Sequence, residues 1–175
     1  GFLTSLISWG RRDLILQAAN YMIELMENHP YQFVKHASDQ EIKRFDKFVY
    51  RTMNAEDIKF IIRALQEFYK DYDSIKEMFA GKEPIVSGLK QLRQNIISYP
   101  HQKRSEKHIA DISKNSAAKR LNMFLRWMVR RCDKGIDFGI WKNIKPSDLI
   151  IPLDLHTAAA GRELGLLNRK QNDLK

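Results

Sequence analysis

The chain has 175 residues, of which 43% are hydrophobic and 29% are charged. This length supports one compact core or two small helical lobes, and this composition excludes wholesale disorder. The formal net charge of +9 is the most informative total, because a strongly basic protein attracts polyanions such as nucleic acids. A solvated basic surface is the plain alternative, and charge alone does not distinguish the two.

The numbers and spacing of cysteine and histidine residues exclude several kinds of cofactor site. The single cysteine, Cys132, excludes an internal disulfide and any zinc or iron–sulfur site built from cysteines, and it is typical of a reducing, cytoplasmic environment. None of the five histidines is at metal-binding spacing, so we expect neither a metal nor another cofactor. The apolar stretch 2–9 lacks a basic leader and is too short to span a bilayer, so we expect a core helix there and no membrane partner.

Apolar residues recur at helical spacing along nearly the whole chain, and no window alternates with the period of two that marks a strand. The pattern therefore predicts an all-α fold. Asn54 and Asp154 precede two of the expected helices, where such side chains favour capping. In chain order we expect helices at 2–9, 12–27, 31–36, 39–50, 54–69, 73–79, 85–97, 105–112, 117–132, 146–150 and 154–164.

Positive charge is concentrated in residues 101–145, which hold twelve Lys/Arg against four Asp/Glu. Within this stretch, helical spacing in 117–132 places Lys119, Arg126 and Arg130 on one face. Judged by pattern alone, a surface helix with a solvated basic side is the simpler interpretation. The same face also suits contacts with nucleic-acid phosphates.

Lys119 and Asp154 are the residues most suited to chemistry. Lys119 lies in the first turn of its expected helix, beside Arg120. The positive end of a helix and a cationic neighbour both disfavour an ammonium, and a nucleophilic amine must be neutral. Asp154 precedes a helix, so capping alone would explain it. A capping carboxylate also stays ionised and held in place, and can stabilise positive charge that develops on a sugar.

Two segments around these residues resemble motifs of the helix-hairpin-helix DNA glycosylase superfamily, which includes endonuclease III and the adenine and 8-oxoguanine glycosylases. Residues 116–119, Ser-Ala-Ala-Lys, resemble the end of its Leu-Pro-Gly-x-Gly-x-Lys hairpin, and residues 152–157, Pro-Leu-Asp-Leu-His-Thr, resemble its Val-Asp-x-His motif. The strings KRLNMFLRWMVRR, IIPLD and LGLLNRKQNDLK are similar to an uncharacterised bacterial family related to these enzymes. That similarity covers most of the chain.

The resemblance implies one glycosylase-like helical domain over 1–175, with a cleft between two lobes and a hairpin-plus-aspartate segment at 115–157. It also implies further chain before Gly1 and after Lys175. Asn115 and Ala117 stand where the superfamily has glycines. The cysteine cluster of endonuclease III is missing, so no iron–sulfur cluster is implied. Lys119 and Asp154 are 35 positions apart, which exceeds the separation in endonuclease III and is nearer that of the archaeal 8-oxoguanine enzymes.

By this resemblance Lys119 matches the Schiff-base lysine and Asp154 the catalytic aspartate. The implied function is base-excision repair, in which a glycosylase, with or without abasic-site lyase activity, acts on a flipped damaged base. The implied protein is a cytoplasmic, nucleoid-associated monomer whose partner is damaged duplex DNA. Two alternatives remain open, a non-catalytic nucleic-acid-binding module and a protein-interaction domain with a basic face. The side chains expected to contact DNA are Asn115, Ser116, Arg120, Arg126, Arg130 and His156.

Overall fold

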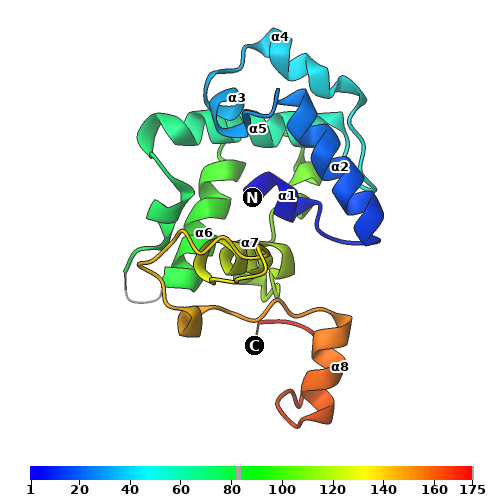
Figure 1. Ribbon diagram of the computed structural model, residues 1–175, viewed down its shortest axis with the longest axis vertical. Helices are drawn as coiled ribbons and strands as arrows, with labels where there is room; N and C mark the ends of the chain where they lie inside the picture. Colours follow the sequence, from blue (N-terminus) through cyan, green and yellow to red (C-terminus); the bar gives the residue numbers. More distant parts are fainter. Residues whose placement is uncertain (82–83, 175) are drawn as a thin grey trace.

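The computed structural model describes residues 1–81 and 84–174. They form helices and loops, with no β-strand in these two ranges, which confirms the all-α prediction (Figure 1). The α-helices in chain order are α1 (Phe2–Leu6), α2 (Arg12–Leu25), α3 (Pro30–His36), α4 (Asp39–Ile42), α5 (Ala55–Asp71), α6 (Pro84–Ile97), α7 (Lys119–Val129) and α8 (Leu155–Glu163). The 3-10 helices are η1 (Lys43–Lys47), η2 (Ile75–Phe79), η3 (Lys103–His108), η4 (Ile112–Lys114) and η5 (Pro146–Asp148).

Helix α5 is the longest element and carries the core of the first half of the chain. The apolar face that its sequence spacing predicts is buried, with Ile58, Ile61 and Ile62 each 0% exposed. Helices α3, η1 and α6 pack against α5. Its start is also as predicted, because Asn54 accepts a hydrogen bond from the Asp57 amide while the Asp57 carboxylate accepts one from the Asn54 amide. This reciprocal capping satisfies amides that a helix start leaves without partners.

A second packing centre joins the N-terminal helix to the basic helix. Helix α1 lies against α7, where the Phe2 and Phe124 rings meet edge to face at 5.5 Å. Trp141 packs edge-on against Phe124 with their centroids 5.3 Å apart. Helix α6 packs tightly on η2 because Gly88 has no side chain, and a Cβ there would lie 2.3 Å from the Phe79 ring. The N-terminal helix α1 and the loop that follows α7 thus both pack against α7.

Several expected helices differ from the structure in type or extent. The one expected at 2–9 ends at Leu6, and those expected at 73–79 and 146–150 are the 3-10 helices η2 and η5. The one expected at 39–50 is α-helical only to Ile42 and continues as η1. The one expected at 105–112 is divided between the end of η3 and the start of η4, and residues 109–111 between them are not helical. In η3, Ser105 and His108 both turn toward the Asp57 carboxylate, and residues three apart lie on one face in a 3-10 helix. These contacts with α5 hold η3 in place.

The basic helix expected at 117–132 begins at Lys119 and ends at Val129. It cannot begin earlier because Ala118 has a left-handed backbone, with φ of +45°. At the other end, the amides of Phe138 and Trp141 donate to the carbonyls of Trp127 and Met128, at 2.7 and 2.8 Å. The loop after α7 therefore supplies the bonds that would otherwise continue the helix.

Helix α8 stands at one end of the molecule, far from α3 and α5 (Figure 1). Ala158 is its one buried residue. None of the helices in the described ranges has the length and apolar content needed to cross a membrane. The position of α8 matters because the aspartate that caps its start, Asp154, contacts Lys119 of α7.

Candidate active site

The fold brings together Lys119 and Asp154, the two residues that the sequence marks as most suited to chemistry. Lys119 Nζ lies 3.4 Å from Asp154 Oδ2, although 35 positions separate them in the chain. The Lys119 side chain is 30% exposed and that of Asp154 is 34% exposed. The pair is therefore an ion pair in contact with solvent, and a molecule arriving from outside can reach both groups.

Local structure holds each member of the pair. Lys119 is the first residue of α7. Asp154 is the N-cap of α8, as its sequence context predicts, and its Oδ1 accepts a hydrogen bond of 2.9 Å from the Thr157 amide. That bond, together with the nearby charge of Lys119, holds the pKa of the Asp154 carboxyl below its usual value, although partial burial opposes the shift. Asp154 is thus ionised at neutral pH and fixed in orientation.

A cleft of about 480 Å³ adjoins the pair on the Lys119 side. This volume lies within the range of small-molecule sites and exceeds that of a nucleobase. Trp9, Ile109 and Ala118 provide apolar surface, and the lysines at 107, 114 and 119 stand among its polar groups. Asp154 is not part of the lining and reaches the cleft through its contact with Lys119.

Buried Arg93 organises the acidic side of this cleft. Its guanidinium donates to the carbonyls of Glu106 and Ile109 and contacts the Glu106 carboxylate at 2.8 Å. It also lies 3.5 Å from Asp111 Oδ2. With five basic and two acidic side chains in the lining, and both acids engaged by Arg93, the cleft favours an anionic ligand.

Arg120, one of the residues expected to contact DNA, forms hydrogen bonds within the fold. Its guanidinium donates to the Leu6 carbonyl at 2.6 Å and to the Lys107 carbonyl at 3.2 Å. Burial lowers the pKa of Arg120 below its usual value. These bonds tie α1 and η3 to α7 across the cleft, so two of its nitrogens are already occupied.

Asn115 and Ser116 form the turn that precedes α7. Asn115 has a left-handed backbone with φ of +61°, which asparagine tolerates better than most residues. Ser116 Oγ accepts a hydrogen bond of 3.2 Å from the Ala118 amide. The chain near the C-terminus returns to this turn. The Leu174 amide donates to the Asn115 carbonyl at 3.0 Å, and the backbones of Asp173 and Ser116 form an isolated antiparallel β-bridge.

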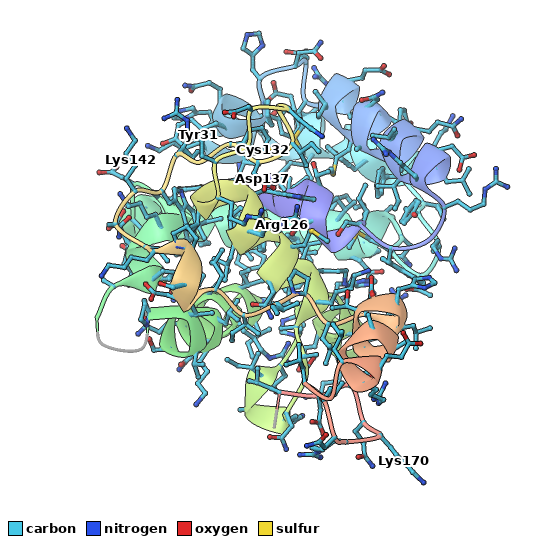
Figure 2. All side chains as sticks on the ribbon, turned by 60° about the horizontal axis from the view of Figure 1, so that its bottom comes forward. Tyr31, Arg126, Cys132, Asp137, Lys142 and Lys170 are labelled. Atoms are coloured by element: carbon cyan, nitrogen blue, oxygen red, sulfur yellow. The ribbon has the colours of Figure 1, made fainter. Side chains whose placement is uncertain are left out.

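Arg126 and Arg130 both lie close to a buried carboxylate, Asp137; Figure 2 shows Arg126 and Asp137 near each other. Their Nε atoms are 3.5 and 3.8 Å from Asp137 Oδ2, and the Asp137 side chain is 1% exposed. Asp137 therefore offsets part of the charge that the sequence places on this face. The arginine side chains remain 35% and 50% exposed, which leaves donors at the surface. No local pattern marked Asp137 for this role, because it lies in a glycine-containing loop.

The remaining predicted residue, His156, is exposed in the first turn of α8. Two cleft residues, Lys107 and Lys114, were not among the predicted site residues. Their only signal in the sequence was membership of the basic stretch. The described ranges contain no group of three His, Cys, Asp or Glu side chains that could hold a metal ion.

A family model described as a protein of unknown function, DUF2400, matches residues 1–175. The chain belongs to the DUF2400 family. No curated protein and no solved structure matches the chain. What this DUF2400 chain does must therefore be inferred from the residues around Lys119 and Asp154.

Proposed function

We propose that this protein is a DNA base-excision glycosylase, with Lys119 and Asp154 at its active centre. The observation that carries the proposal is the 3.4 Å contact between the two side chains. Both belong to segments that resemble the catalytic motifs of helix-hairpin-helix glycosylases. Had they faced different surfaces, no shared chemistry would have been available to them. The cleft beside Lys119 offers space for a base that has left the duplex.

Asp154 supports the step in which the glycosidic bond breaks. As the bond between C1′ and the base nitrogen lengthens, its electron pair leaves with the base and positive charge develops on the sugar. An ionised carboxylate at that position lowers the energy of the charged state. The depressed pKa of Asp154 supports this role, since the carboxylate is already ionised when the substrate arrives.

Lys119 supplies the nucleophile for a covalent route. An ammonium has no free electron pair, so Lys119 must first release a proton, and Asp154 is the nearest carboxylate to accept it. The amine then forms a bond to C1′ as the base departs with its electron pair and takes up a proton. The C1′–O4′ bond then breaks, O4′ takes up the proton that leaves the attached nitrogen, and the nitrogen electron pair forms the C=N bond of an iminium. This iminium is the Schiff base that precedes lyase cleavage. If water is the nucleophile instead, the protein is a glycosylase without lyase activity.

DNA contacts come from the basic groups around this pair. Arg126 and Arg130 project from α7 with a third to a half of each side chain exposed, and they are available to phosphates. Lys107 and Lys114 extend the positive surface along the cleft. Such contacts make binding salt-sensitive and independent of sequence.

Borohydride trapping tests the covalent role. Borohydride reduces a Schiff base to a stable amine, so wild-type protein mixed with duplexes carrying an abasic site or an oxidised base should give a covalent adduct. Lys119→Ala should give none. Lys70→Ala is the matched control, because Lys70 has a 67% exposed side chain on α5 and does not line the cleft, and it should still form the adduct. An adduct that persists in Lys119→Ala, or none with wild type on the whole panel, would exclude the nucleophilic role.

Base release from the same duplexes tests Asp154. Asp154→Asn can still cap α8, because asparagine is as good an N-cap as aspartate, yet it has no charge. We expect it to fold normally and to lose base release. Tight, salt-sensitive binding without base release by the wild type would instead favour the non-catalytic nucleic-acid module, which the replacement of the hairpin glycines by Asn115 and Ala117 supports.

A further inference from the structure

Trp9 stands out among the cleft residues because several neighbours hold it in place. Its carbonyl accepts a hydrogen bond of 2.6 Å from the Tyr50 hydroxyl. The Tyr50 ring meets the indole edge to face, with the centroids 6.5 Å apart. The Arg51 guanidinium lies over the indole at 4.3 Å from its centroid. An indole held on this many sides loses little conformational freedom when a ligand stacks on it.

The backbone around Trp9 is arranged to allow this packing. Arg51 has a left-handed backbone with φ of +53°, a conformation that residues other than glycine, asparagine and aspartate rarely adopt and that tends to occur at functional sites. Gly10 has φ of +105°, and a Cβ there would lie 2.8 Å from Arg51 Nη1. The chain therefore has a glycine where a side chain would push Arg51 away from the indole.

The three tryptophans of the chain differ in surroundings. Trp141 is 6% exposed and belongs to the core between Phe79 and Phe124. Trp127 is half-buried on α7 and does not line the cleft. Trp9 is also half-buried, but it lines the cleft that contains Lys119. It is thus the one of the three placed where a ligand in that cleft can meet an aromatic ring.

We propose that the Trp9–Arg51 pair is the stacking platform for an unpaired DNA base held in the Lys119 cleft. The inference rests on the proposed function for its choice of ligand, and it adds the residues that hold the base. Aromatic rings bind bases through their faces without regard to sequence, and an arginine stacked on the ring adds a cation–π contact. The excess of basic over acidic lining groups suits the phosphates that accompany such a base.

Tryptophan fluorescence tests the stacking directly and requires no catalysis. In a Trp127→Phe/Trp141→Phe variant, Trp9 is the only tryptophan, so selective excitation of indole reports on Trp9 alone. A duplex with one mismatched base should quench its emission, because a base that stacks on indole quenches it. A duplex with an abasic site at the same position should bind without quenching. Equal quenching by both duplexes, or none by either, would overturn the proposal.

Affinity measurements keep the proposal testable if the double variant does not fold. Trp9→Leu should weaken binding to the mismatched duplex by roughly 5- to 150-fold, the range expected for one lost stacking contact, and leave binding to the abasic duplex unchanged. Trp127→Leu removes a half-buried tryptophan outside the cleft and should change neither affinity. Equal losses on both duplexes for Trp9→Leu would mean that Trp9 is only structural. Because all these readouts are of binding, they can succeed even if base release and Schiff-base trapping fail.

Discussion

The buried carboxylate of Asp57 fixes η3, which forms one wall of the cleft, against α5. Replacing Asp57 therefore tests how much these contacts contribute to the stability of the fold. Asp57 is 0% exposed. It accepts hydrogen bonds of 2.6 Å from Ser105 Oγ and 2.7 Å from Arg104 Nη1, in addition to its capping role on α5. His108 Nε2 lies 3.1 Å from its other oxygen. All three partners belong to η3, which borders the cleft through Glu106 and Lys107.

The cost of Asp57→Asn follows from these contacts. Removing the charge from a buried ion pair costs about 3–5 kcal/mol, because the partner charge is left uncompensated. The Arg104 side chain is 40% exposed, so its charge can regain water, and we expect the lower end, about 3 kcal/mol. For a chain of this length the melting temperature falls by about 2–4 °C per kcal/mol, which gives a decrease of roughly 6–12 °C.

Thermal unfolding by calorimetry or circular dichroism measures this decrease, and Asp46→Asn is the matched control. Asp46 also pairs with a residue of α5, Lys59, at 2.8 Å, but its side chain is 55% exposed. Exposed pairs contribute about 0–1 kcal/mol, so the control should melt within about 4 °C of the wild type. Hydrogen exchange should quicken in η3 of Asp57→Asn and stay unchanged in α8. Equal effects of the two variants on melting would refute the reasoning.

Three further predictions concern acid, through His108 and Asp57, and the turn that precedes α7. Burial lowers the pKa of His108 and outweighs the opposing effect of Asp57, and the charges of Arg120 and Lys107 add to the lowering. Below about pH 6.5 the imidazole of His108 therefore takes up a proton more readily in the unfolded chain than in the folded chain. The urea midpoint should then fall as the pH drops below about 6.5, and it should fall less in His108→Gln. An equal fall in both proteins would contradict this assignment. The hydrogen bonds that Asp57 accepts lower its pKa despite its burial, so its contribution is present above about pH 3.9 and is lost on stronger acidification. At the left-handed Asn115, Asn115→Gly should change the melting temperature little and Asn115→Ala should cost about 1 kcal/mol; an alanine variant as stable as wild type would show that the turn can relax.

Features determined by neighbours in the chain were predictable from the sequence. The caps at Asn54 and Asp154 and the buried face of α5 depend on contacts within one or two helical turns. Residues three or four apart on a helix meet wherever that helix is placed, so the pattern carries the information. The same locality explains why the all-α class was predictable and why most helices lie near their expected positions.

Features that depend on distant segments were decided only by the tertiary structure. The sequence shows that Arg120 and Arg126 are cationic, but the carbonyl of Leu6 and the carboxylate of Asp137 decide where their guanidinium groups lie. The 3.4 Å between Lys119 and Asp154 is likewise set by the loop that returns from α7 to α8. Residue types and spacing determined which chemistry was available in this chain. Only packing, in which side chains from α1, η3 and α7 must share one interior without overlap, decided which groups face each other across the cleft.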